Sequence, residues 1–109
     1  MKNENKQYLE RVKEEILEYY NGKTDDDGNE LGLYDYISTQ VLDNRYIIEG
    51  NLEYRSCELF ITLGGPTVWI ETESKTLQIR WGGEKDELYL GSDVCDELDR
   101  IYEEFYICR

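Results

Sequence analysis

The chain has 109 residues, which is enough for one domain and too few for two ordinary ones, so we expect a single domain spanning residues 1–109. Acidic residues outnumber basic residues 25 to 12, and the net charge of -13 argues against nucleic acid or an anionic membrane as the partner, because phosphate binding requires Lys and Arg. Ten Tyr, two Trp and two Phe exclude a disordered acidic tail. The charge therefore predicts a basic partner or serves solubility alone.

The N-terminal third of the chain predicts two helices joined by a polar loop. Within residues 3–20, Tyr8, Val12, Ile16 and Tyr20 recur at every fourth position, as on one face of an amphipathic helix. Residues 23–30 are polar and predict a loop. A second, shorter helix is expected over residues 33–42, in which apolar side chains recur at the same spacing.

The middle of the chain predicts strands. The segments with β-type patterns are residues 45–49, 54–63, 67–71, 76–81 and 87–90. The clearest alternation places Cys57, Leu59 and Ile61 on one face and Phe60 on the other. The connections between consecutive segments are short, which favours antiparallel pairing.

A final helix is expected from Ser92, a residue type that suits the N-cap position. Its apolar stripe is expected to comprise Val94, Leu98, Ile101, Phe105 and Cys108. The predicted fold class is therefore α+β, with two N-terminal helices, an antiparallel sheet of three to five strands, and a C-terminal helix packed on the sheet.

The residue types that carry most enzyme chemistry are scarce. The chain has no His, and the three cysteines (Cys57, Cys95 and Cys108) form no C-x-x-C pair and lie on predicted apolar faces. We therefore expect buried structural thiols, no metal, no cofactor and no catalytic activity. The polar N-terminus and the absence of a long apolar run predict a cytosolic protein.

The acidic loop 25–30 raises the question of a calcium site. An EF-hand alignment that puts Gly28 at position 6 places Lys23 at position 1 and Tyr34 at position 12, where acidic ligands are required. An ordinary solvated loop is therefore the favoured interpretation, and a weak ion site is the alternative.

Acidic side chains recur along both long helices and in this loop. The candidate partner-binding carboxylates are Glu10, Glu14 and Glu18 in the first helix, Asp25, Asp26, Asp27 and Glu30 in the loop, and Asp96, Asp99 and Glu103 in the last helix. Like charges at helical spacing destabilise a helix by a few tenths of a kcal/mol each. Such rows predict a surface that imitates nucleic-acid phosphates. The alternative is an ordinary solvated face, and Arg11, Lys13 and Arg100 interrupt the negative charge.

A second candidate surface comes from the strands. If the alternating aliphatic residues face the helices, then Phe60, Trp69 and Arg80 face away from them. Trp and Arg are frequent in binding hot spots, so this face predicts a partner or a homodimer. The alternative is that another helix covers this face and makes both aromatic residues part of the core.

Four features of the last two-thirds of the chain resemble small acidic proteins of phages and conjugative elements of Gram-positive bacteria. They are L-Y-D-Y-I at 33–37, L-G-G-P-T-V-W-I-E-T at 63–72, W-G-G at 81–83, and the acidic terminal helix. The resemblance implies an inhibitor of host defence, of the anti-CRISPR or antirestriction type. That group is united by role, so no functional residue is transferred from it.

These observations lead to one hypothesis and one alternative. The hypothesis is an inhibitor that blocks the nucleic-acid-binding site of a host-defence nuclease, an RNA-guided CRISPR nuclease first of all, through the acidic residues. The alternative is a protein-interaction module or small homodimeric structural protein that uses Phe60 and Trp69.

Overall fold

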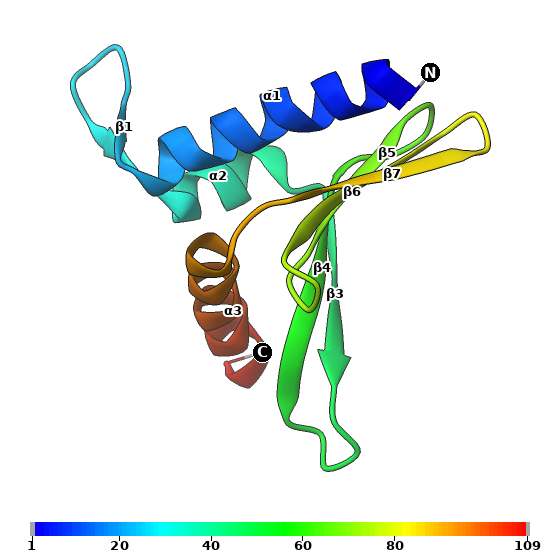
Figure 1. The fold of residues 1–109 in the computed structure, drawn as a ribbon. Helices are drawn as coiled ribbons and strands as arrows, with labels where there is room; N and C mark the ends of the chain where they lie inside the picture. The colour runs from blue at the N-terminus through cyan, green and yellow to red at the C-terminus, as the bar shows by residue number, and fades with distance from the viewer. Residues whose placement is uncertain (1, 109) are drawn as a thin grey trace.

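The computed structural model describes residues 2–108 and has an α+β architecture (Figure 1). The elements in chain order are α1 (Lys2–Tyr20), β1 (Lys23–Thr24), β2 (Glu30–Leu31), α2 (Leu33–Gln40), β3 (Asp43–Ile48), β4 (Tyr54–Thr62), β5 (Thr67–Glu71), β6 (Thr76–Trp81), β7 (Glu84–Tyr89) and α3 (Ser92–Ile107). The predicted α+β class, the antiparallel sheet and the C-terminal helix are confirmed. The N-terminal part differs from the prediction, since it has one long helix and a helix of only eight residues.

The main sheet is an antiparallel meander with the order β3-β4-β5-β6-β7. One row of cross-strand neighbours runs through its centre, because Leu59 pairs with Ile70, Ile70 with Leu77, and Leu77 with Leu88. The first three of these side chains are fully buried. The alternation of side chains along each strand therefore gives the sheet one apolar face, which we call the inner face.

The helices cover the inner face. α1 lies against β6 and β7, and α3 lies against β4 (Figure 1). Leu9 and Ile16 of α1, Tyr36 of α2, and Leu98 and Ile101 of α3 are buried in the same core cluster as the central row of the sheet. Burial of one sheet face by helices is thus the packing that holds the elements together.

The C-terminal helix is rotated relative to the predicted stripe. Its buried residues are Val94, Cys95, Leu98, Ile101, Tyr102 and Tyr106. Phe105 and Cys108, which the predicted stripe included, are exposed. The reason is that tyrosine rings pack well when the hydroxyl finds a partner, and Tyr106 donates its hydroxyl proton to the Leu52 carbonyl at 2.7 Å. Ser92 is the first helical residue, and Gly91 holds the N-cap position.

The polar segment 23–30 is not only a loop, because β1 and β2 pair as a short hairpin. In the main sheet, β6 and β7 are joined by Gly82 and Gly83, whose φ angles of 60° and 85° lie in the left-handed region. Two such residues in succession are typical of a tight hairpin turn, and glycine adopts them without strain. The turn places Trp81 and Glu84 opposite each other.

The three cysteines differ in their environment. Cys57 and Cys95 are buried, whereas Cys108 is exposed, so the prediction of three buried thiols is wrong for Cys108. Burial raises the pKa of the Cys57 thiol to about 11 and that of Cys95 to about 12. A thiol reacts as its thiolate, so these two are unreactive near neutral pH.

We therefore expect one of the three thiols to react with Ellman's reagent in the native protein at pH 8. Cys108 should react within minutes, and Cys57 and Cys95 should react only after unfolding in guanidinium chloride. The released chromophore gives the count. Cys108→Ser should remove the fast reaction. Any fast-reacting thiol that remains in that variant would contradict the burial of Cys57 and Cys95.

Stability should decline between pH 8 and pH 10. An unfolded thiol loses its proton near a pKa of about 8.5, whereas folded Cys57 and Cys95 keep theirs, so alkaline pH favours the unfolded chain. The loss is on the order of 2 kcal/mol per thiol at pH 10. Urea denaturation across this range measures it. The double variant Cys57→Ala, Cys95→Ala should show a shallower decline, and an equal slope would contradict the assignment.

Candidate partner-binding surfaces

A row of exposed carboxylates runs along the outer side of α1. Glu10, Glu14 and Glu18 are all exposed and point away from the core that Leu9 and Ile16 enter. Their four-residue spacing corresponds to a rise of about 6 Å between neighbours. We call this row the acidic ridge.

Among the described residues, Arg11 and Lys13 of α1 form no ion pair with the acidic ridge. The Lys13 ammonium donates to the backbone carbonyl of Tyr89 at 3.0 Å, and the Arg11 guanidinium lies 5.6 Å from the centre of the Tyr8 ring. Within residues 2–108, Glu10 and Glu14 have no ion pair. Glu18 lies 3.9 Å from the Lys23 ammonium, and an exposed pair at this distance contributes little. Glu10 and Glu14 are therefore exposed without an ion pair in the described residues, although Arg11 lies beside Glu14 and Glu18.

The loop between β1 and β2 continues from the C-terminal end of α1 (Figure 1). Asp25 shapes this loop, because its Oδ1 accepts hydrogen bonds from the backbone N–H groups of Asp27 at 3.0 Å and Asn29 at 2.8 Å. The bond from Asn29 lowers the pKa of the Asp25 carboxyl. Asp26, Asp27 and Glu30 are exposed. In the described part of the chain, none of these three forms an ion pair.

The predicted acidic residues of α3 have three different environments. Asp96 lies 3.4 Å from the Lys75 ammonium, and Glu103 is exposed. Asp99 is turned toward the protein, where its Oδ1 accepts hydrogen bonds from the Tyr54 hydroxyl at 2.6 Å and the Thr72 hydroxyl at 2.7 Å. Burial, and then the bond to Asp99, raise the pKa of Tyr54. The structure therefore does not bring these three carboxylates together as one outward-facing row.

The outer face of the sheet carries the aromatic pair. Phe60 and Trp69 are cross-strand neighbours with ring centroids 6.0 Å apart. The Arg45 guanidinium lies 5.3 Å from the centre of the Phe60 ring, and the Lys85 ammonium lies 6.0 Å from that of Trp69. Trp69 is only 8% exposed, yet it is outside the core cluster that the helices share. Its burial comes from strand neighbours, and within residues 2–108 no helix supplies a buried residue to this face.

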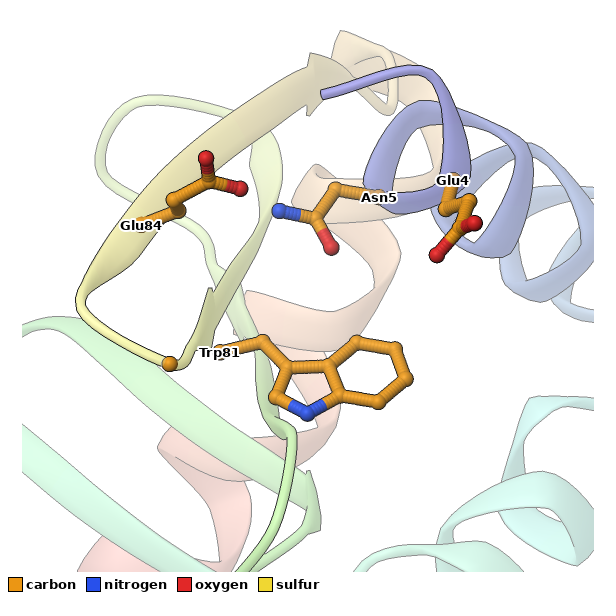
Figure 2. A pocket seen from close by; sticks show the side chains of 5 residues that line it. Glu4, Asn5, Trp81 and Glu84 are labelled. Atoms are coloured by element: carbon orange, nitrogen blue, oxygen red, sulfur yellow. The ribbon is translucent and has the colours of Figure 1, made fainter. Parts of the chain in front are cut away.

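A cavity of about 310 Å³ lies between the start of α1 and the β6–β7 hairpin. It is lined by Glu4, Asn5, Trp81, Gly82 and Glu84 (Figure 2). None of these residues is among the binding residues predicted from the sequence. One signal was available, because Asn5 lies four residues before Leu9 and so occupies the inward side of the helix, where an apolar residue is expected.

The described residues offer little for metal chemistry. Residues 2–108 contain no group of three or more His, Cys, Asp or Glu side chains arranged to hold a metal ion. The absence of a cofactor and of catalysis remains a prediction. None of the helices described in residues 2–108 combines the length and the apolar composition needed to cross a bilayer.

Comparison with known proteins supplies no relative. No protein-family model matches the chain, and no curated protein and no solved structure matches it significantly. The function must therefore be argued from the residues and their arrangement.

The internal role of Asp99 predicts a difference between two neighbouring acids of α3. Asp99→Ala should lower the free energy of unfolding by about 2–3 kcal/mol, because the half-buried Tyr54 hydroxyl and the buried Thr72 hydroxyl lose a charged acceptor. Asp96→Ala removes an exposed carboxylate of the same helix and should change stability by less than about 1 kcal/mol. Urea denaturation at pH 7 measures both. Equal changes in the free energy of unfolding would contradict a stabilising role for the Asp99 hydrogen bonds.

Proposed function

We propose that this protein acts by binding a basic, nucleic-acid-binding surface of another protein and so excludes nucleic acid from it. The single observation that supports this function is the acidic ridge, whose Glu10 and Glu14 have no ion pair within the described residues. The exposed Asp26, Asp27 and Glu30 extend the negative surface beyond the end of α1.

The chemistry of the ridge suits a groove that normally holds phosphates. Lys and Arg side chains bind carboxylates through charge-assisted hydrogen bonds, as they bind phosphate oxygens. The rise of about 6 Å between ridge carboxylates is coarser than the ~3.4 Å rise per nucleotide of one strand, so the ridge would occupy alternate cationic positions. Because the net charge is -13, long-range attraction would also accelerate the encounter.

The partner class that we propose is a host-defence nuclease, and specifically an RNA-guided CRISPR nuclease. Such enzymes hold the guide–target duplex in a positively charged channel and read a short flanking motif with arginines, so they present the cations that the ridge requires. The resemblance of residues 33–37, 63–72 and 81–83 to small acidic proteins of mobile elements is the reason for choosing this class among nucleic-acid-binding proteins.

The outer face of the sheet supports a second candidate, a protein-interaction module or homodimer. The Phe60–Trp69 pair lies outside the helix-covered core, and Arg45 and Lys85 lie over the two rings. Trp, Tyr and Arg are enriched at binding hot spots. Binding through this face would depend little on salt, whereas binding through the acidic ridge would weaken as salt increases.

The ridge proposal predicts that charge reversal on α1 abolishes inhibition. In a panel of purified RNA-guided nucleases, the wild-type protein should block target-DNA binding by at least one member. Glu10→Lys with Glu14→Lys should raise the half-inhibitory concentration at least tenfold, since two attractive contacts become repulsive. The measurement is a DNA-binding titration at about 50 and about 200 mM salt, and inhibition should be weaker at the higher concentration.

The matched control is Glu49→Lys with Glu53→Lys. This pair has the same sequence spacing and makes the same change in net charge, but it lies in the exposed β3–β4 connection. It should alter inhibition less than threefold. If both double variants lose inhibition equally, overall charge rather than the ridge is responsible. If the wild-type protein inhibits no member, the proposed partner class is wrong.

A further inference from the structure

The cavity beside the start of α1 contains a buried polar group without a partner. Asn5 is 1% exposed, and its Oδ1 accepts no hydrogen bond within the part of the chain that the structure describes. Figure 2 shows the Asn5 amide directed into the space between the Trp81 ring and the Glu84 side chain. Buried carbonyl oxygens are nearly always hydrogen-bonded, so an unpaired one calls for a physical explanation.

Stability alone does not explain this asparagine. Asn5 occupies the inward side of α1, four residues before the fully buried Leu9. An aliphatic side chain at this position would bury more apolar surface and leave no unpaired acceptor. A ligand that donates a hydrogen bond to Oδ1 would satisfy the group, and binding would then compensate for the cost in the unliganded protein.

The other lining residues define the charge and shape of this ligand. Trp81 is 43% exposed and presents an indole ring, which attracts cations over its face. Glu4 and Glu84 border the cavity with negative charge. Both residues also take part in other interactions, so we assign them no hydrogen bond to the ligand. Glu4 also lies in the first turn of α1, where it offsets the positive end of the helix dipole.

The geometry points to a binding site for a guanidinium group, held by Asn5 Oδ1 and stacked on Trp81. A guanidinium is planar, carries a delocalised charge and donates several hydrogen bonds, so it satisfies the acceptor, the ring and the negative border together. The volume of about 310 Å³ is at the small end for ligand cavities and suits one head group with its alkyl chain. The nearby Lys6 does not supply this cation, because its ammonium pairs with Asp86 at 3.3 Å.

The guanidinium has two chemical sources, an arginine side chain of a protein and a free guanidinium compound. The site lies at the end of α1 opposite the β1–β2 loop (Figure 1), and it does not depend on the function proposed for the acidic ridge. Its test therefore uses small probes and no nuclease.

The experiment follows the two indole N–H resonances by NMR during titration of the full-length protein. The probes are blocked Gly-Arg-Gly peptide, agmatine, blocked Gly-Lys-Gly and blocked Gly-citrulline-Gly. The Trp81 resonance should shift with saturation at millimolar Gly-Arg-Gly, whereas that of Trp69, on the outer sheet face, should stay in place. Citrulline, which has the same shape without the charge, should bind at least tenfold more weakly, and so should lysine. Tighter binding of the peptide than of agmatine would identify a protein side chain as the source, and the reverse would identify a free ligand.

Two variants separate a ligand site from a structural asparagine. Asn5→Leu should abolish the Trp81 shift and at the same time raise the Tm of the unliganded protein by roughly 4 °C, because the unpaired acceptor is gone. Asn5→Asp keeps an acceptor at this position and should retain binding. Asn21→Leu makes the same chemical change at an exposed position directly after the C-terminal end of α1 and should alter neither readout. The proposal is overturned if no arginine probe shifts Trp81, if citrulline binds equally well, or if Asn5→Leu binds normally.

Discussion

The burial of one sheet face beneath the helices is the constraint on which the rest of the structure depends. The row formed by Leu59, Ile70, Leu77 and Leu88 packs in one core with all three helices, and α1 and α3 supply Leu9, Ile16, Leu98 and Ile101 to it. Because side chains alternate along each strand, this choice also fixes what the outer face presents. The same packing turns the acidic side of α1 to solvent. The candidate surfaces are therefore consequences of the core, although no core contact requires their particular charges.

The strands were predictable because their pattern is simple. In β4 to β6, aliphatic residues occur at every second position, and Gly or Pro lies in the β4–β5 and β6–β7 connections, so the segments expected at 67–71 and 76–81 match β5 and β6. The short β1–β2 hairpin could not be predicted, because two-residue strands carry no periodicity. The position of α3 in the chain was predicted correctly, but the side of the helix that faces the core was not. Two overlapping stripes exist in its sequence, and the buried one includes Tyr102 and Tyr106, whose amphipathic rings a purely apolar pattern excludes.

The candidate site residues were less predictable because their roles depend on contacts between distant segments. Asp96, Asp99 and Glu103 look equivalent in the sequence, yet Asp99 alone accepts hydrogen bonds from Tyr54 and Thr72, which are far from it in the chain. The role of Asn5 was also only partly predictable. Its inward position followed from the spacing to Leu9, but its proximity to Trp81 depends on how the β6–β7 hairpin meets α1. Spacing indicates the face of a helix, whereas it does not identify what that face contacts.

Two features of the protein oppose its own stability, and both carry the binding proposals. The acidic ridge sets like charges at four-residue spacing on an exposed face, where Lys or Arg would have been compatible with the same packing. Asn5 leaves an acceptor unpaired where an aliphatic residue would pack. Local choices that oppose the fold are expected at functional positions, because elsewhere a sequence tends to agree with its structure at every level. As proposed, the ridge and the cavity would bind the same kind of group, a cation, since both present oxygen acceptors beside carboxylates. A basic surface that reaches along α1 would meet the ridge with its row of cations, and at the start of the helix one arginine could enter beside Trp81.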